Sequence, residues 1–353
     1  MAATIACTAT ANDDLTQYVN TLMGTQSSFE LSTGNTYPAV AMPWGMNFWT
    51  PQTGKMGDGW AYTYDAHKIR GIKQTHQPSP WINDYGQFSM MATVGTPVFD
   101  EEKRASWFSH KGETAMPHYY KVYLADHDVV AEVTPTERAA MFRFTFPATD
   151  SANVIIDAFD RGSAINIDAS KHRVTGYTTR NSGGVPDNFR NYFVVEFDRP
   201  FEYFYTVTDS VLSKGATSAE GNHTGAIVGF KTSKGEIVNA RVASSFISPE
   251  QALLNLNELG NDSFDILVAK GKDRWNTELG KIRVEDGKET DMRTFYSCLY
   301  RCLLFPRKFY ELDASGKPVH YSPHTGEVKD GYMYTDTGLW DTFLSLIHIS
   351  EPT

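Results

Sequence analysis

The sequence is poor in cysteine and in long apolar runs. It has three cysteines in 353 residues, Cys7, Cys298 and Cys302, which are too few for a disulfide framework. Cys298 and Cys302 are four residues apart on a predicted helix, with no histidine or third cysteine nearby. We therefore expect buried thiols rather than a zinc site. No apolar run approaches the roughly 18 residues of a membrane-spanning helix.

Clustered positive charge is also missing. The chain has 32 Lys and Arg against 42 Asp and Glu, a formal net charge of −10, and the basic residues are scattered. Without a basic stripe there is no case for a nucleic-acid partner. Aromatic residues are plentiful at 13% and gather before residue 130 and from 295 to 343. This distribution favours a ligand made of rings and hydroxyl groups over a phosphate or a metal ion.

The first residues, M-A-A-T-I-A-C-T-A-T-A, are small like the end of a signal peptide. They lack a basic segment and an apolar core. Residues 1–14 fit the remnant of an export signal and a low-complexity leader equally well.

The stretch 71–86, G-I-K-Q-T-H-Q-P-S-P-W-I-N-D-Y-G, is the first candidate site. Its two prolines exclude a helix and a central strand, so we predict a stiff loop that presents His76, Trp81 and Asp84. A flat indole beside short polar side chains suits a sugar. The alternative is a buried turn in which His76 and Asp84 bond to backbone. Trp60 follows a Gly-Asp-Gly turn and is a further candidate, with core filling as its alternative.

Hydrophobic alternation has a period of two from residue 88 to 246. M-F-R-F-T-F is the clearest half-buried strand, with Phe142, Phe144 and Phe146 on one face. At least eight strands without intervening helices predict stacked antiparallel sheets, a β-sandwich. The predicted strands are 88–94, 129–133, 140–146, 154–159, 192–197, 201–208, 226–231 and 237–246.

The pattern changes at Ser248. Residues 248–251, S-P-E-Q, form a predicted capping box with proline at the first helical position. Further helices are predicted at about 262–279 and 290–305, which places a domain boundary near residue 247. Residues 306–341 are loop-like, and the last ten residues, 344–353, follow no cap or turn pattern. We expect that tail to be foreign to the natural protein.

Six segments of the chain, taken together, resemble bacterial glycoside hydrolase family 92, the calcium-dependent exo-acting α-mannosidases. The resemblance implies a β-sandwich over 15–247, a helical linker over 248–305 and the truncated start of an (α/α)6 barrel over 306–343. The segments are Y-V-N-T-L-M-G-T (18–25), G-N-T-Y-P-A-V-A-M-P-W-G-M (34–46), K-Q-T-H-Q-P-S-P-W-I-N-D-Y-G (73–86), P-T-E-R-A-A-M-F-R-F (135–144), T-R-N-S-G-G-V-P (179–186) and L-W-D-T-F (339–343).

The resemblance also implies an activity. Family members hydrolyse terminal α-linked mannose with inversion, using one carboxylic acid as the acid and a second carboxylate as the base. Calcium contacts the mannose hydroxyls. We expect a periplasmic or secreted enzyme of N-glycan degradation with a preference for α-1,2 linkages. The acid, the base and most calcium ligands belong to the barrel, so we expect no catalytic or metal-binding residue here and an inactive fragment.

What remains by resemblance is the sandwich half of the sugar site. Trp340 and Asp341 match the pair that lines the mannose subsite, and the loop of His76, Trp81 and Asp84, with Trp60, is expected on the rim that faces the barrel. Asp341 has helix capping as its alternative, and Asp84 has turn capping. Two rival functions stay open: a non-catalytic carbohydrate-binding sandwich, and a structural domain without a ligand.

Overall fold

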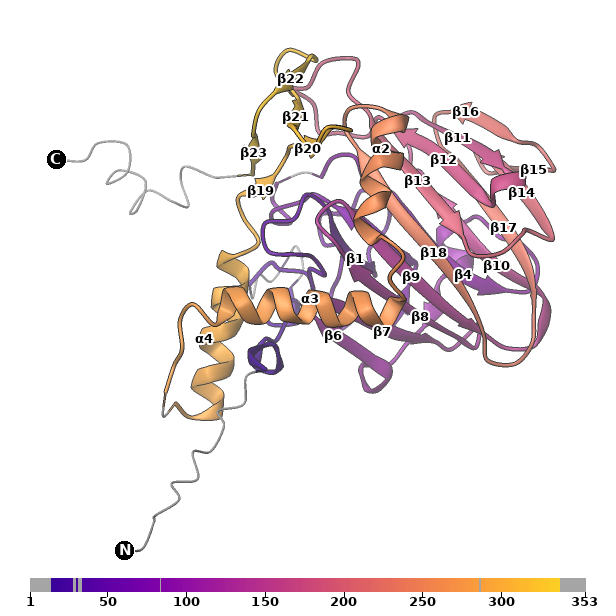
Figure 1. Ribbon diagram of the computed structural model, residues 1–353. Coiled ribbons are helices and arrows are strands. Elements are labelled where there is room, and N and C mark those ends of the chain that lie inside the picture. Colours follow the sequence, from indigo (N-terminus) through magenta and orange to yellow (C-terminus); the bar gives the residue numbers. More distant parts are fainter. Residues whose placement is uncertain (1–13, 28–29, 31–33, 83, 286, 337–353) are drawn as a thin grey trace, which may run out of the picture.

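The computed structural model describes residues 14–27, 30, 34–82, 84–285 and 287–336. Two antiparallel sheets stack as a sandwich, with helices α2 and α3 against one layer (Figure 1). Trp340, Asp341 and the tail predicted to be foreign lie outside the described residues. No helix in the described part of the chain is long and apolar enough to cross a bilayer.

The first sheet has seven strands, in the order β1 (Phe48–Gln52), β3 (Gly71–Thr75), β4 (Ser89–Val94), β10 (Thr149–Asp157), β17 (Thr224–Thr232), β14 (Tyr203–Thr208) and β15 (Val211–Lys214). The second has nine, in the order β16 (Ser218–Gly221), β11 (Ser163–Asp168), β12 (Arg173–Thr178), β13 (Asn191–Phe197), β18 (Glu236–Ser245), β9 (Ala139–Phe146), β8 (Val129–Pro135), β7 (Tyr119–Leu124) and β6 (Glu113–Met116). A two-stranded pair, β2 (Lys68–Ile69) with β5 (Ser106–Trp107), lies outside both sheets.

Alternation along the strands explains why the sheets stack. Phe142, Phe144 and Phe146 are fully buried, whereas the residues between them on β9 are half-buried. The inward rows of both sheets join in one apolar core that includes Trp49, which packs edge to face on Phe142 with ring centroids 5.0 Å apart. The predicted sandwich is confirmed, and all eight predicted strands are present.

The structure corrects the prediction for residues 71–86. Gly71–Thr75 forms β3, which pairs with both β1 and β4 inside the seven-stranded sheet. Pro78 and Pro80 restrict only their own and the preceding residue, so the five residues before them remain able to pair. A loop throughout 71–86 is therefore wrong for its first third. Only 76–86 is irregular in the part that the structure describes.

The helices fall where the period changes, after Ser248. They are α2 (Pro249–Asn255), the 3₁₀ turn η4 (Leu256–Leu259), α3 (Phe264–Leu279) and α4 (Glu289–Cys302). The Ser248 Oγ accepts from the Gln251 N–H at 3.1 Å. Gln251 does not return the bond, because its Nε2 donates to Asn255 Oδ1 and to the Leu312 carbonyl. Ser248 therefore caps α2 without the predicted reciprocal box.

The predicted burial of the helix cysteines is wrong. Helix α4 buries Tyr296, Ser297 and Tyr300, whereas Cys298 and Cys302 are both exposed. Residues four apart share a helix face, and this pair shares the face that points away from the sandwich contacts. The helix also ends three residues earlier than predicted.

Short elements complete the described chain. A single helical turn, α1 (Glu101–Arg104), interrupts the strand region that we expected to be free of helices. The other 3₁₀ turns are η1 (Leu15–Tyr18), η2 (His110–Gly112) and η3 (Ala169–Lys171). After α4 come the pair β19 (Arg307–Lys308) with β23 (Tyr334–Thr335) and the small sheet β20 (Glu311–Leu312), β21 (Pro318–Tyr321) and β22 (Val328–Asp330), beside the sandwich (Figure 1).

Candidate functional site

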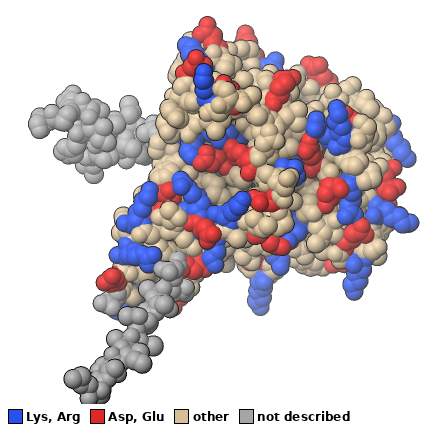
Figure 2. Space-filling model, in the orientation of Figure 1, with Lys and Arg blue, Asp and Glu red and all other residues tan. Residues whose placement is uncertain are grey.

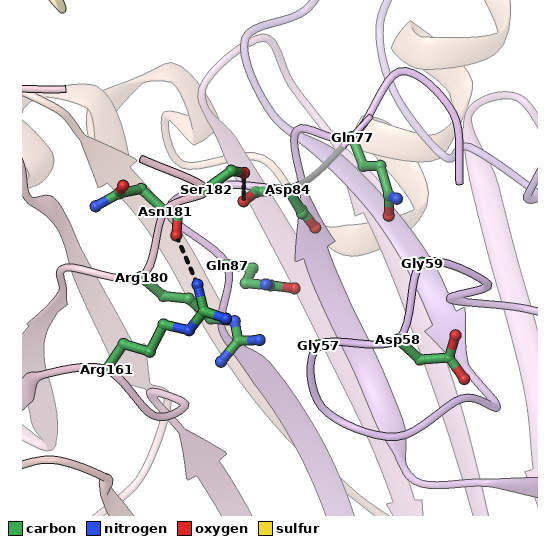
Figure 3. A pocket seen from close by; sticks show the side chains of 10 residues that line it. All are labelled: Gly57, Asp58, Gly59, Gln77, Asp84, Gln87, Arg161, Arg180, Asn181 and Ser182. Carbon is green, nitrogen blue, oxygen red and sulfur yellow. Dashed lines mark hydrogen bonds between the residues drawn. The ribbon is translucent and has the colours of Figure 1, made fainter. Parts of the chain in front are cut away.

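A polar pocket of about 240 Å³ lies where loops from both sheets meet (Figure 3). The loop after β1, the β3–β4 loop, the β10–β11 turn and the β12–β13 loop each contribute to it. Because strands of both layers end here, residues far apart in the chain converge on one cavity. The lining residues are Gly57, Asp58, Gly59, Gln77, Asp84, Gln87, Arg161, Arg180, Asn181 and Ser182.

Two tryptophans meet where the first two of these loops touch. A Cβ on Gly59 would lie 2.6 Å from the carbonyl oxygen of Pro80, so only glycine allows this approach without a shift. Next to the contact, Trp60 and Trp81 pack edge to face with ring centroids 5.1 Å apart and an interplanar angle of 82°. Trp81 is 58% exposed. The structure thus brings two of the predicted sugar contacts together and leaves an indole surface accessible to a ligand.

Asp84 organises the loop from within. Its Oδ1 accepts from the His76 N–H at 2.9 Å, and its Oδ2 accepts from the Thr75 hydroxyl at 2.8 Å and lies 3.2 Å from Lys73 Nζ. Burial alone would raise the pKa of Asp84, but the Lys73 charge and these hydrogen bonds lower it below its usual value. The carboxylate is therefore ionised and held in the turn, as in the capping alternative, while Asp84 still lines the pocket.

His76 is buried behind the pocket rather than in it. Nδ1 lies 2.7 Å from the Tyr85 carbonyl, and Nε2 lies 3.0 Å from Asn47 Oδ1. Burial and the nearby Arg307 charge lower the pKa of His76 to about 4. At pH 7 the ring is neutral and donates to one of these two oxygens. The buried-turn alternative describes His76, and a direct sugar contact from its ring is not what this geometry offers.

An ion pair links this loop to the segment after α4. The Tyr85 hydroxyl donates to Asp336 Oδ2 at 3.1 Å, and Arg307 donates to the same oxygen from Nε at 2.9 Å and from Nη2 at 2.6 Å. Arg307 also donates to the carbonyl of His76. The chain just before Trp340 and Asp341 therefore lies beside the 76–86 loop. That these two residues join the same site stays a prediction, because they lie outside the described residues.

Two arginines that line the pocket are not among the site residues predicted from the sequence. Arg161 Nη1 donates to the Asn181 carbonyl at 3.0 Å, and Arg180 forms an ion pair with Asp160. Burial lowers the pKa of Arg180. Both side chains lie close together in Figure 3. The only sequence signal was T-R-N-S at 179–182, which stands in one of the segments that resemble family 92.

The described residues do not supply a metal centre of their own. No three His, Cys, Asp or Glu side chains among them are grouped so that they could hold an ion. The carboxylates beside the pocket are engaged by protein donors: Asp84 by Lys73, and Asp58 by the Trp60 N–H at 2.9 Å. The calcium requirement and the place of its ligands therefore stay predictions.

Comparison with known proteins identifies the family of the chain. Residues 18–245 match the glycosyl hydrolase family 92 N-terminal domain, and residues 251–352 match the family's catalytic domain. The chain belongs to glycosyl hydrolase family 92. The second match continues past residue 343 into the tail predicted to be foreign, whose origin stays a prediction.

Solved structures agree. The chain is 48% identical to an inverting family 92 mannosidase from Bacteroides thetaiotaomicron, with a TM-score of 0.92, covering 94% of this chain and 45% of that one. It is 29% identical to a family 92 α-mannosidase of the same organism in complex with mannoimidazole, with a TM-score of 0.84 and coverages of 94% and 45%. An uncharacterized secreted glycosidase from Arthroderma benhamiae is 22% identical, over 84% of this chain and 42% of that protein. The chain spans less than half the length of each.

Proposed function

We propose that this chain is the N-terminal part of an exo-acting α-mannosidase that removes terminal α-linked mannose with inversion, with α-1,2 linkages as its preferred substrate. The observation that carries the proposal is the polar pocket beside the Trp60–Trp81 pair, on a fold shared at 48% identity with an inverting mannosidase. A sugar offers apolar ring faces and hydroxyl edges. Indoles complement the faces, and amides, hydroxyls and charged groups complement the edges.

The pocket is preorganised for such a ligand. Gln77 and Gln87 project amides into it, and the Ser182 hydroxyl donates to the Asp84 carbonyl at 3.1 Å. Lys73 donates to Gln87 Oε1 at 2.9 Å and holds that side chain in place. Fixed polar groups lose little conformational entropy when a ligand binds. The sandwich thus contributes recognition to a site that the continuing chain completes.

The same geometry supports the proposal that the 353-residue chain alone does not hydrolyse mannosides at a useful rate. Inverting hydrolysis needs a protonated acid and a carboxylate base about 6.5–9.5 Å apart, with room for water. Asp84 is held ionised by Lys73, and Asp336 accepts from Arg307 and Tyr85. Both carboxylates are engaged by protein donors, which supports an acid and a base outside the described residues, and loss of general acid–base catalysis costs roughly 10²–10⁴-fold per group.

Further parts of the proposal concern the longer protein. We expect it to require calcium, bound mainly by the continuing barrel, and to act on N-glycans outside the cytoplasm. Likeness to a protein described as a secreted glycosidase supports the location.

The test is mannose release with added calcium, comparing this chain with a protein extended through its natural gene. We expect turnover by the long protein, with α-1,2-mannobiose preferred over other linkages, β-mannose as the first product by NMR, and loss of activity with a chelator. If the short chain hydrolyses mannosides nearly as fast as the long protein, the proposal that the acid and base lie outside this chain is contradicted. A long protein that binds mannosides without hydrolysing them would favour the rival, a non-catalytic carbohydrate-binding sandwich.

A further inference from the structure

A second hollow lies on the outer face of the nine-stranded sheet and shares no lining residue with the pocket described above. Antiparallel pairing places side chains of β16, β11, β12 and β13 in rows across this face, because directly opposed residues point the same way. One row runs Glu220, Ala164, Tyr177, Tyr192, and the next runs Ser218, Asn166, Thr175.

The hollow exists because Ala164 is small. It stands between Glu220 on one side and Tyr177 on the other, and its methyl group leaves the space that these longer side chains surround. The cavity measures about 430 Å³, and Pro249, the first residue of α2, is among its lining residues. Alternation directs Ile165 inward to the core, so backbone and the Ala164 methyl form the floor.

The Tyr177 ring that forms one wall is fixed by three contacts. Tyr192 packs edge to face at 6.0 Å, the Arg190 guanidinium lies 5.1 Å from the ring centroid, and the hydroxyl donates to Glu220 Oε1 at 3.0 Å. A ring held in this way is ordered before a ligand arrives, so less entropy is lost on binding. The second carboxylate oxygen of Glu220 can still accept a hydrogen bond.

The hollow continues along the strands. A neighbouring cavity of about 440 Å³ shares Asn166 and Thr175 with it and extends to Asp168 and Arg173. From Arg173 to Tyr177 the groove covers four residue steps of β12, about 13 Å at the rise of a β-strand. It is therefore an elongated trough rather than a point site.

We propose that this groove, which we call the outer groove, binds a segment of a neutral glycan chain, apart from the hydrolytic site. Its lining alternates an ordered aromatic ring with hydroxyl, amide and carboxylate groups, which is the chemistry that recognises sugar faces and edges. Arg173 is paired with Glu196 at 2.5 Å. The Arg190 charge on one side of the Tyr177 ring is offset by the Glu220 carboxylate at the hydroxyl of the same ring, so the groove has no excess of positive charge for a phosphate. The apolar side chains of its lining are Ala164, Ile165, Tyr177, Tyr192, Ala219 and Pro249. They cover far less area than the about 800 Å² per partner of a stable protein interface.

The position of the outer groove suits a role beside hydrolysis. In Figure 1, β11, β12 and β16 lie on the opposite side of the molecule from α4 and β23, after which the chain continues. Acidic and basic side chains are interspersed over the face drawn in Figure 2, without a large patch of one sign. A polymer bound at the groove raises the effective concentration of chain ends at the hydrolytic site. The choice of α-mannan as its ligand rests on the proposed function.

The test uses the protein extended through its natural gene and measures its retardation in a native gel that contains yeast α-mannan. Tyr177→Ala removes the wall, and Ala164→Leu fills the floor while keeping the Tyr177 ring. We expect both variants to bind mannan at least fivefold more weakly while hydrolysing a small aryl α-mannoside at the wild-type rate. Tyr123→Ala is the matched control, since Tyr123 is exposed on β7 of the same sheet and should change neither property.

Three outcomes of these measurements would contradict either the glycan-binding proposal or the proposed function. If the wild type hydrolyses the aryl mannoside but neither groove variant weakens mannan binding, the outer groove is not a glycan site. If Ala164→Leu converts a wild-type dimer to a monomer on gel filtration, the occupant is a second copy of this chain and the proposal fails. If mannan binding depends on Tyr177 but no mannoside is hydrolysed, the outer groove is supported as a glycan site and the proposed hydrolytic function is contradicted.

Discussion

Arg307 Nη2 lies 2.6 Å from Asp336 Oδ2, and this ion pair joins the segment after helix α4 to the sandwich. The Arg307 side chain is 1% exposed and that of Asp336 13%. Arg307 also donates to the carbonyls of Thr75 and His76, where β3 ends and the pocket loop begins. One buried guanidinium therefore holds the start of the pocket loop against the chain that leads to Trp340.

The first prediction concerns that pair. Arg307→Met should lower the free energy of unfolding by about 3–5 kcal/mol, because it strands a mostly buried carboxylate and two carbonyls. Arg293→Met is the matched control, since Arg293 pairs with Glu289 across an exposed helix face with side chains 51% and 70% exposed. An exposed pair contributes about 0–1 kcal/mol. Urea denaturation measures both. Similar small losses in the two variants would show that Arg307 is not a clamp.

The sequence allowed the sandwich to be predicted because its signal is local. Alternation in M-F-R-F-T-F and the cap at Ser248 are properties of neighbouring residues, and both appear in the structure. The pocket could be predicted only in part. Arg161 precedes β11 and Arg180 follows β12, and the two residues meet because these strands pair antiparallel with Ser163 opposite Thr178. Neither strand is among those predicted from the sequence, so the approach of the two arginines could not be predicted either.

Two predictions from the sequence are wrong for physical reasons: the loop over residues 71–86 and the burial of the helix cysteines. The prolines at 78 and 80 predict a loop over the whole stretch, but their effect does not reach Thr75. Cys298 and Cys302 were expected in the core because cysteine is commonly buried. The buried face of α4 is instead the one that carries Tyr296 and Tyr300, since large aromatic rings bury more apolar surface than thiols.

Acid should destabilise the fold through a buried histidine. Burial, with a contribution from Lys272, lowers the pKa of His118 to about 4, whereas Asp14 opposes the shift. The unfolded chain, with a histidine pKa near 6.5, then binds more protons between pH 4 and 6.5, so the free energy of unfolding rises with pH over this window. His118 contributes about 3 kcal/mol, present above pH 6.5 and lost as pH falls through 4.

The test of this window is His118→Leu. Its ring nitrogen Nδ1 has no hydrogen-bond partner within the described part of the chain, so the substitution removes a titrating group without breaking a bond from it. Denaturation midpoints from pH 4 to 6.5 should vary less with pH in the variant than in the wild type. The comparison at pH 7.5, above both pKa values, gives the packing cost alone. Parallel pH profiles would exclude His118 as the source.

Trp81→Ala should weaken substrate binding in the extended enzyme. The exposed indole offers a sugar an apolar face, so we expect KM to rise roughly fivefold, about 1 kcal/mol, with kcat nearly unchanged because the acid and base are not touched. Trp107→Ala is the control: Trp107 is 50% exposed on β5, stacked on His67. If both substitutions, or neither, change KM, Trp81 is not a specific sugar contact.

The exposed cysteines of α4 report whether the continuing chain covers this helix. In a Cys7→Ser background of the 353-residue chain, Cys298 and Cys302 should both react with a thiol reagent nearly as fast as in denaturant, because both are exposed. In the extended protein we expect the reaction to slow at least a hundredfold, since a barrel packed on α4 would shield both thiols. The additional double substitution Cys298→Ser with Cys302→Ser supplies the blank. Equal rates in the short and extended proteins would show that this face of α4 stays open, and the barrel would then have to pack elsewhere.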